Sequence, residues 1–336
     1  MRRAWLAAAL VAAALTAACG SSGSARLDPR PFSSQSVWNA PLADDAPLDP
    51  HSAALVGELR RIVGTATAAH DGPWIASGQY STPVYTVPAG QRAVRVKLDV
   101  AERSNMQGAF AAVPLPGDAR PAAGTDRHLT VWQPSTDRLW EFWQLARRAD
   151  GWHARWGGAM EHVSKSPGYF EASSWPGARP YWGATASSLP LLGGLITRAD
   201  VTERRIDHAL AFALPAIRSG VFAAPAQRTD GRDPRPGAIP MGARFRLDPT
   251  LDLDSLHLPP ITRMIAEAVK RHGMVLRDTA STIQFYAEDF TATGPDPLPD
   301  LIGPDYPNTY WRQLAAFPWD RLQLLKMDLS SKAGAP

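Results

Sequence analysis

The chain has 336 residues, a formal net charge of +3, and 45% hydrophobic residues. This length and hydrophobicity allow a buried core and exclude an intrinsically disordered protein. The nearly balanced charge gives no general attraction to nucleic acid, so we expect no nucleic-acid partner.

The first eighteen residues have the charge pattern of a secretory signal. Arg2 and Arg3 precede an apolar run over residues 4–15, which is too short to remain as a membrane-spanning helix. Small residues then lead to Cys19, and this order resembles a bacterial lipobox, whose cysteine receives a diacylglycerol. We therefore predict a signal peptide over residues 1–18, lipidation of Cys19, and a lipid anchor as the only membrane contact, on the extracytoplasmic face. Because Cys19 is the only cysteine, thiol catalysis, disulfides and cysteine-based zinc sites are excluded.

A flexible tether and two helices follow in the sequence. Residues 19–30 are rich in Gly and Ser and predict the tether. Asp49-Pro50 opens a helix whose apolar stripe ends at Gly64, and Pro260 opens a second helix that closes at Gly273. Both helices are expected to serve packing.

Most of the remaining segments have the alternation of β-strands, and numerous Pro and Gly residues separate them. Strands do not alternate regularly with helices, which argues against a doubly wound α/β fold. We therefore predict a mainly β fold, a jelly-roll-like β-sandwich with a few packing helices. A single domain is expected over residues 31–328, followed by a disordered tail over 329–336.

The region between residues 128 and 156 allows strand register to be predicted. Pairing across the turn at residues 134–137 sets Thr130 opposite Glu141 and Val131 opposite Trp140. A three-residue loop ending at Gly151 would place the third strand in phase with this sheet. One face then carries the polar and indole side chains His128, Thr130, Trp132, Glu141, Trp143, His153 and Arg155.

This polar face suits a sugar, because indoles stack on pyranose rings while charged groups hydrogen-bond hydroxyls and carboxylates. A solvated outer face of a sheet would explain the same pattern. In the later loop at residues 225–231, Arg228 could hold a uronate carboxylate and Asp230 a hydroxyl, and an ordinary Asp-Gly turn is the alternative.

Two further segments carry candidate catalytic groups. His208 falls in phase with Ile206 and Leu210, where a histidine is most often a satisfied core residue. Tyr286 and Glu288 share one face of a predicted strand over residues 282–288 and would suit proton transfer, although a solvated face fits equally well. Zinc, phosphate-loop and dinucleotide motifs are missing, and we expect neither a metal nor a cofactor.

Seven short segments stand out along the chain, and they are Trp38–Pro41, Tyr80–Tyr85, Leu139–Trp143, Trp182–Ala186, Ile206–Ala209, Pro225–Gly231 and Phe317–Arg321. These segments resemble a group of secreted bacterial proteins and lipoproteins of unassigned activity. They lie across nearly the whole mature chain, which implies one domain, and no residue role can be transferred from the group. The strand pattern also loosely resembles jelly-roll glycoside hydrolases and polysaccharide lyases, which implies a glycan partner.

The leading hypothesis is a surface-anchored enzyme that cleaves a polysaccharide. As a glycoside hydrolase, it would use Glu141 with Asp230 or Glu288 as its two carboxyl groups, and Trp132 and Trp143 as stacking platforms.

As a polysaccharide lyase, the protein would use Tyr286 or His208 to abstract a proton, while Arg155 or Arg228 neutralises the adjacent carboxylate. The sequence leaves both versions open. The alternative is an envelope lipoprotein that binds a glycan without cleaving it.

Overall fold

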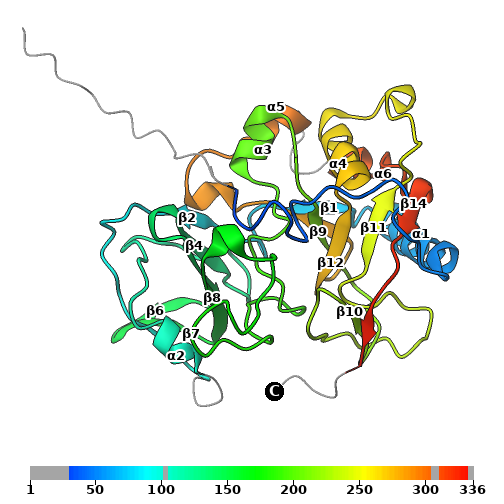
Figure 1. Ribbon diagram of the computed structural model, residues 1–336. Helices are drawn as coiled ribbons and strands as arrows, with labels where there is room; N and C mark the ends of the chain where they lie inside the picture. The colour runs from blue at the N-terminus through cyan, green and yellow to red at the C-terminus, as the bar shows by residue number, and fades with distance from the viewer. Residues whose placement is uncertain (1–29, 101–104, 304–309, 332–336) are drawn as a thin grey trace, which may run out of the picture.

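The computed structural model describes residues 30–100, 105–303 and 310–331. The predicted signal peptide, the lipidation site Cys19 and nearly all of the predicted tether lie outside these residues. Two groups of sheets lie side by side, and most of the helices gather around one of them (Figure 1).

The first group is built on a six-stranded mixed sheet. β9 pairs in parallel with β12, and β1 pairs in parallel with β13, whereas the other neighbours are antiparallel. The order of strands in the sheet is β1 (Trp74–Ala76), β13 (Gln284–Tyr286), β9 (Leu210–Leu214), β12 (Met274–Thr279), β11 (Arg244–Leu247) and β14 (Leu322–Leu324).

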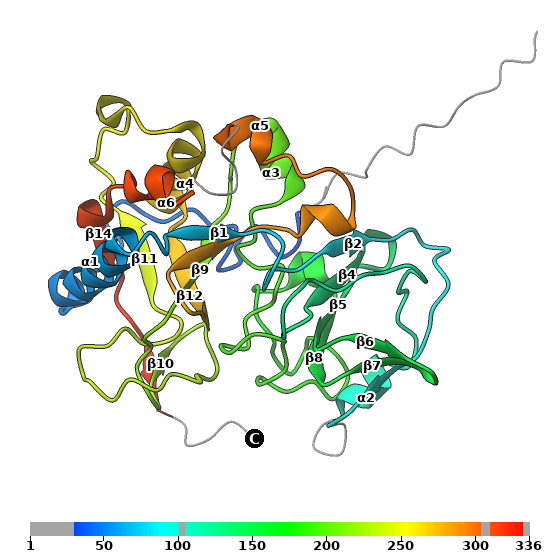
Figure 2. The same ribbon diagram turned by 180° about the vertical axis from the view of Figure 1, so that it is seen from behind.

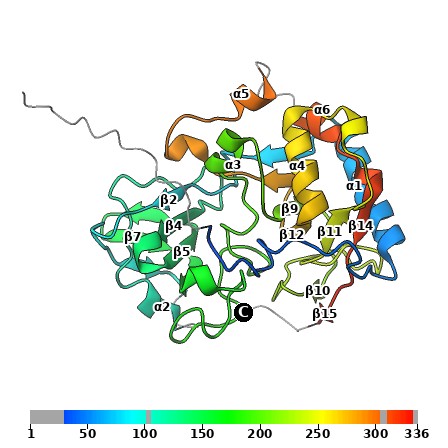
Figure 3. The same cartoon turned by 45° about the horizontal axis from the view of Figure 1, so that its top comes forward.

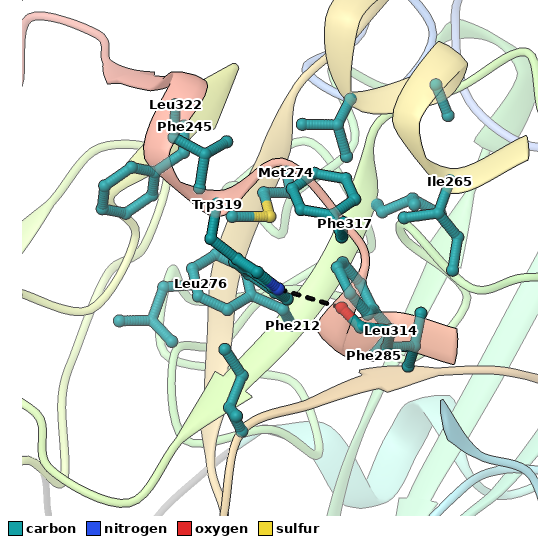
Figure 4. Close-up of a cluster of buried hydrophobic side chains, with 14 of the residues drawn as sticks. Phe212, Phe245, Ile265, Met274, Leu276, Phe285, Leu314, Phe317, Trp319 and Leu322 are labelled. Atoms are coloured by element: carbon teal, nitrogen blue, oxygen red, sulfur yellow. Dashed lines mark hydrogen bonds between the residues drawn. The ribbon is translucent and has the colours of Figure 1, made fainter. Parts of the chain in front are cut away.

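Helices cover one face of this sheet, and Figure 3 shows α4 and α6 above it with α1 at its edge. These helices are α1 (Ser52–Ala68), α4 (Pro260–Arg271) and α6 (Tyr310–Ala315). Between sheet and helices lies an apolar core in which Phe212 and Phe285 meet Trp319 (Figure 4). The Trp319 indole N–H donates to the Leu314 carbonyl at 2.9 Å, so this buried nitrogen is satisfied.

The second group contains a four-stranded and a three-stranded sheet. The first has the order β2 (Val84–Thr86), β4 (Leu129–Gln133), β5 (Arg138–Trp143), β8 (Trp156–Glu161), and the second β3 (Val96–Leu98), β7 (Gly151–Ala154), β6 (Ala146–Arg148). Their core includes Ala211, Ala213 and Val275 from the six-stranded sheet. The two groups therefore share an interior.

Short elements complete the described chain, and the view from behind shows α3 and α5 at the top, between the two groups (Figure 2). The helices and strands are α2 (Met106–Ala109), α3 (Arg198–Glu203), α5 (Pro299–Ile302), β10 (Phe222–Ala223) and β15 (Leu329–Ser330). The 3₁₀ turns are η2 (Pro134–Thr136), η3 (Val163–Lys165), η4 (Asp254–Leu256), η5 (Phe290–Ala292) and η6 (Trp319–Arg321). β15 pairs with β10, beyond the domain boundary predicted at residue 328.

The predicted jelly-roll-like β-sandwich is wrong. The fold is mixed α/β, with 22% helix and 24% strand in several mixed sheets that neither close nor curl into a sandwich. The physical reason lies in β9 and β12, which pair in parallel although they are far apart in sequence. Helices cover one face of this pair and the second group covers the other, so the strands are buried on both faces and their pattern does not show what packs against them.

The predicted register of the central hairpin is confirmed, because Thr130 pairs with Glu141 and Val131 with Trp140. The predicted pairing of the third strand with this hairpin through a three-residue loop is wrong. Gln144 adopts a left-handed φ of 54°, and the strand path leaves the sheet there. β6 and β7 then form a hairpin in the separate three-stranded sheet, with Arg148 paired with Gly151 instead of a three-residue loop. β8 returns to β5 only after this excursion.

The second predicted helix is confirmed by α4, which begins at Pro260 and is followed by Gly273 at a φ of 84°. The predicted end of the first helix at Gly64 is wrong, because α1 continues to Ala68. Gly64 is solvent-exposed on this helix, where the glycine lowers stability without breaking the hydrogen-bond ladder.

Candidate functional site

A cavity of about 780 Å³ opens between the two groups of sheets. One side, which we name the indole wall, comes from the second group and consists of Asp126, His128, Trp143, Arg155 and Trp156. The opposite side, which we name the acid wall, consists of Arg228, Thr229, Asp230, Asp278 and Thr279. Residues 184–186 also line the cavity, and we name them its floor.

The indole wall is built by the pairing of β5 with β8, which sets Trp143 opposite Trp156 on one face. The Trp143 indole N–H donates to Asp126 Oδ1 at 3.0 Å, and this bond fixes the ring. The Trp156 ring stacks on Tyr181 with centroids 6.2 Å apart. Arg155 lies between β7 and β8, where the chain re-enters the sheet, and its guanidinium stands 5.7 Å from the centre of the Trp143 ring.

His128 lies at the start of β4 and is 5% exposed. Its Nε2 has no hydrogen-bond partner among the described residues. Burial lowers the pKa of His128 to about 4, so the imidazole is neutral at pH 7. The Nε2 atom is itself buried, so this histidine lines the cavity without presenting that nitrogen to a ligand.

Asp278 reaches the acid wall because β12 is irregular. In a regular strand Asp278 would share the side of Met274 and Leu276, which face the helices. The register shifts between Leu276 and Asp278, and Asp278 therefore pairs with Ala213, whose side chain packs on the side of the second group. A β-bulge thus turns this carboxyl group toward the cavity.

The two carboxyl groups of the acid wall are connected through Thr279. The Thr279 hydroxyl donates to Asp230 Oδ1 at 2.6 Å, and the Thr279 backbone N–H donates to Asp278 Oδ1 at 2.9 Å. Asp278 Oδ1 also accepts the Ala186 N–H at 3.3 Å, while its Oδ2 has no hydrogen-bond partner among the described residues. Burial, aided by the negative charge of Asp230, raises the pKa of Asp278 to about 7.

Glu141 does not face the cavity but holds the segment that carries its floor. The side chain is 0% exposed, with Oε1 accepting the Ala184 N–H and Oε2 the Leu191 N–H, each at 2.7 Å. Burial raises the pKa of Glu141 to about 7. Both oxygens are occupied by backbone donors, so Glu141 is unsuited to the catalytic role predicted for it.

Two arginines fasten the same segment through its carbonyl groups. Arg228 donates to the carbonyls of Tyr181, Gly183 and Thr185 at 2.7–3.0 Å. The buried Arg277 donates to the carbonyls of Leu191 and Gly193 at 2.6 and 2.8 Å. The floor is therefore fixed by charged side chains from three separate strands or loops.

The structure brings part of the predicted site together. His128, Trp143, Arg155, Arg228 and Asp230 all line the one cavity. The other predicted residues do not line it, and these are Thr130, Trp132, Glu141, His153, His208, Tyr286 and Glu288. Residues predicted from the sequence thus lie on both walls, whereas most of the groups predicted for catalysis lie elsewhere.

Trp132 and Tyr286 are core residues. Trp132 is 1% exposed, because both faces of β4 are covered. Tyr286 lies under Arg277, whose guanidinium carbon is 4.3 Å from the ring centre, and burial raises the pKa of the phenol. Neither side chain is placed to contact a ligand in the cavity.

His208 lies before β9 at a separate cavity of about 290 Å³. Its Nε2 is 3.1 Å from Asp200 Oδ2 and its Nδ1 is 2.9 Å from the Ala209 carbonyl. Both nitrogens face acceptors, so this histidine tethers α3 to the sheet as an imidazolium. The Glu288 carboxylate accepts the backbone N–H of Arg198, the first residue of α3, at 2.8 Å. Burial raises the pKa of Glu288 to about 7.

The sequence argument missed Asp126, Trp156, Asp278 and Thr279. A signal for Asp278 was present, since Arg277-Asp278 places two charges directly after the apolar run 274–276 of a buried strand. Such charges inside a fold need partners or a function.

The chain matches no protein-family model, and no curated protein or solved structure is significantly similar to it. Within the described ranges no helix has the length and apolar character needed to cross a membrane. The same residues contain no group of three or more His, Cys, Asp or Glu side chains placed to hold a metal ion. The chemistry of the cavity must therefore be inferred from its geometry.

Proposed function

We propose that the protein binds a glycan in the cavity and hydrolyses a glycosidic bond there, with Asp278 as the general acid and Asp230 as the second carboxylate. The observation that carries this proposal is that a pair of carboxyl groups and two indoles line the same cavity. Indole faces bind the apolar faces of sugar rings, and glycoside hydrolysis uses two carboxyl groups with different protonation states.

Asp278 has the properties of the proton donor. Its Oδ2 has no hydrogen-bond partner in the described part of the chain, and a pKa raised to about 7 keeps a proton available on the group near neutral pH. The proton passes to the glycosidic oxygen as the bond to the anomeric carbon breaks.

Asp230 is the exposed carboxylate of the pair, and Thr279 holds one of its oxygens. The free oxygen either attacks the anomeric carbon or takes a proton from the attacking water. In both cases one water molecule is consumed and two sugar hydroxyl ends form.

The hydrolase differs from the version expected from sequence, in which Glu141 was one of the carboxyl groups. Glu141 instead supports the floor, and Asp278 takes its place. Tyr286 and His208, the proton acceptors of the lyase version, do not line the cavity. The positions of these residues therefore favour hydrolysis over elimination.

The test is a panel of neutral, acidic and cell-wall polysaccharides, assayed for new reducing ends and for ultraviolet-absorbing unsaturated ends. We expect new reducing ends without unsaturation. Asp278→Asn and Asp230→Asn should each lower kcat by about a hundredfold or more, whereas the exposed Asp118→Asn should leave kcat unchanged. Because Asp278 must be protonated, kcat should also fall as the pH rises above about 7.

Other outcomes would contradict the proposal in distinct ways. Unsaturated products would identify a lyase. Binding of a glycan, seen as a change in tryptophan fluorescence, without any product would indicate the non-catalytic glycan-binding protein. Wild-type turnover that survives Asp278→Asn would remove the assigned acid.

A further inference from the structure

The indole wall holds hydrogen-bond donors that the protein leaves unused. Arg155 is exposed, and its guanidinium has no ion-pair or hydrogen-bond partner among the described residues. An exposed guanidinium without a protein partner on one side of a cavity is suited to an acceptor that the ligand supplies.

Arg228, the other arginine that lines the cavity, is already engaged by the protein, because its N–H groups donate to three backbone carbonyls. Within the described lining, Arg155 is therefore the cation whose N–H groups remain available.

The position of Arg155 above Trp143 leaves these donors well oriented. The guanidinium carbon lies over the indole, 5.7 Å from the ring centre, and this cation–π contact leaves the N–H groups at the edge of the guanidinium without a protein partner among the described residues. That edge matches the two oxygens of a carboxylate. Trp143 is itself fixed by Asp126, so the arginine rests on a rigid support.

We propose that the sugar bound on the indole wall is a uronic acid and that Arg155 binds its carboxylate. This inference rests on the proposed glycan cavity and adds the class of sugar. Asp230, the ionised carboxylate of the acid wall, repels an anionic substituent, so the ligand is oriented with its carboxylate at Arg155 and its glycosidic oxygen toward the protonated Asp278.

The experiment measures calorimetric binding of trimers of galacturonate, glucuronate and mannuronate. Each trimer is compared with its carboxyl-reduced counterpart, which keeps the ring but loses the charge. We expect at least one uronate trimer to bind about tenfold or more tightly than its neutral counterpart. Arg155→Gln should abolish this difference, and Arg155→Lys should retain part of it because a point charge replaces the planar fork.

Arg147→Gln is the matched control. Arg147 stands 6.0 Å from the centre of the Trp152 ring in the three-stranded sheet, the same type of contact on a residue that does not line the cavity. Its loss should leave the uronate preference unchanged. Repeating the titrations with Asp278→Asn keeps the trimers intact if the wild type cleaves them.

The outcomes separate this inference from the proposed cleavage. Equal binding of the charged and neutral trimers, or tighter binding of sulfated than of carboxylated sugars, overturns the uronate assignment even if a glycan is hydrolysed. Uronate binding that depends on Arg155 without any cleavage supports the inference and overturns the hydrolase. A uronate preference that survives Arg155→Gln overturns the role of Arg155.

Discussion

At the scale of single residues, a sequence pattern predicted the pairing partner of Glu141 but not its role. Its pairing partner Thr130 followed from the turn and the alternation of the hairpin, and the structure has that pair. Its role did not follow, because the donors to Glu141 are backbone N–H groups of Ala184 and Leu191, more than forty residues away. A conspicuous acid between two aromatic residues can thus be a structural anchor.

Glu141→Gln tests this anchoring role. The amide keeps one acceptor, but its NH₂ group faces the second backbone N–H, so one buried hydrogen bond is lost and a donor is left unpaired. We expect the free energy of unfolding to fall by about 2 kcal/mol in urea titrations. The matched change Glu161→Gln, in β8 at a half-exposed ion pair with Arg138, should cost less than about 1 kcal/mol. Equal stability of the two variants would rule out the anchoring role.

At the scale of elements, local rules predicted the hairpin and α4 but not the irregular backbone that builds the site. The turn at 134–137 and the cap at Gly273 are encoded by residues with strong local preferences. The left-handed Gln144 and the bulge before Asp278 carry no such signature. They arise because the surrounding packing fixes them, and they determine which residues reach the cavity.

Glycine-to-alanine substitutions in α1 and in β8 should change the stability of the protein in opposite directions. In α1, a Cβ on Gly57 or Gly64 would meet nothing within 4 Å, so each change to Ala should stabilise the protein by about 0.5–1 kcal/mol. In β8, a Cβ on Gly157 would lie 2.1 Å from the Glu141 carbonyl oxygen, so Gly157→Ala should destabilise it by about 3 kcal/mol. Thermal unfolding measures both effects, and a Gly157→Ala variant with wild-type Tm would contradict the close approach of β5 and β8.

At the scale of the whole molecule, the composition correctly indicated a chain with a substantial core, but the fold class did not follow from strand patterns. Every residue of β9 is apolar, so its sequence does not distinguish its two faces. In the structure helices cover Phe212, whereas Ala211 and Ala213 pack against the second group of sheets. Parallel pairing with β12 joins segments about sixty residues apart. Such pairings depend on the complete chain and leave no local trace.

The buried titratable groups predict how stability depends on pH. Glu141, Asp278 and Glu288 have pKa values raised to about 7, so they bind protons when folded and release them on unfolding between about pH 5 and 7. His128 and His272, with pKa values lowered to about 4, act in the opposite direction but are fewer. Stability should therefore fall by about 1.4 kcal/mol per pH unit over this range.

Scanning calorimetry at pH 5.5, 6.5 and 7.5 checks this expectation as a declining Tm. Glu288→Gln, which lies outside the cavity, should remove most of the decline below about pH 6.5, where the two histidines then offset Glu141 and Asp278. A Tm that rises across the same interval would show that the histidines dominate.

The alanine face of β9 has a consequence for recognition. Ala211 and Ala213 have no rotatable side-chain torsions, and they pack in the core that carries the indole wall, on the same sheet that carries Asp278. The distance between the indole wall and the acid wall is therefore set by side chains that cannot change rotamer. A ligand that fits between these walls binds to surfaces that are already ordered. The conformational entropy lost on binding is therefore mainly that of the flexible ligand.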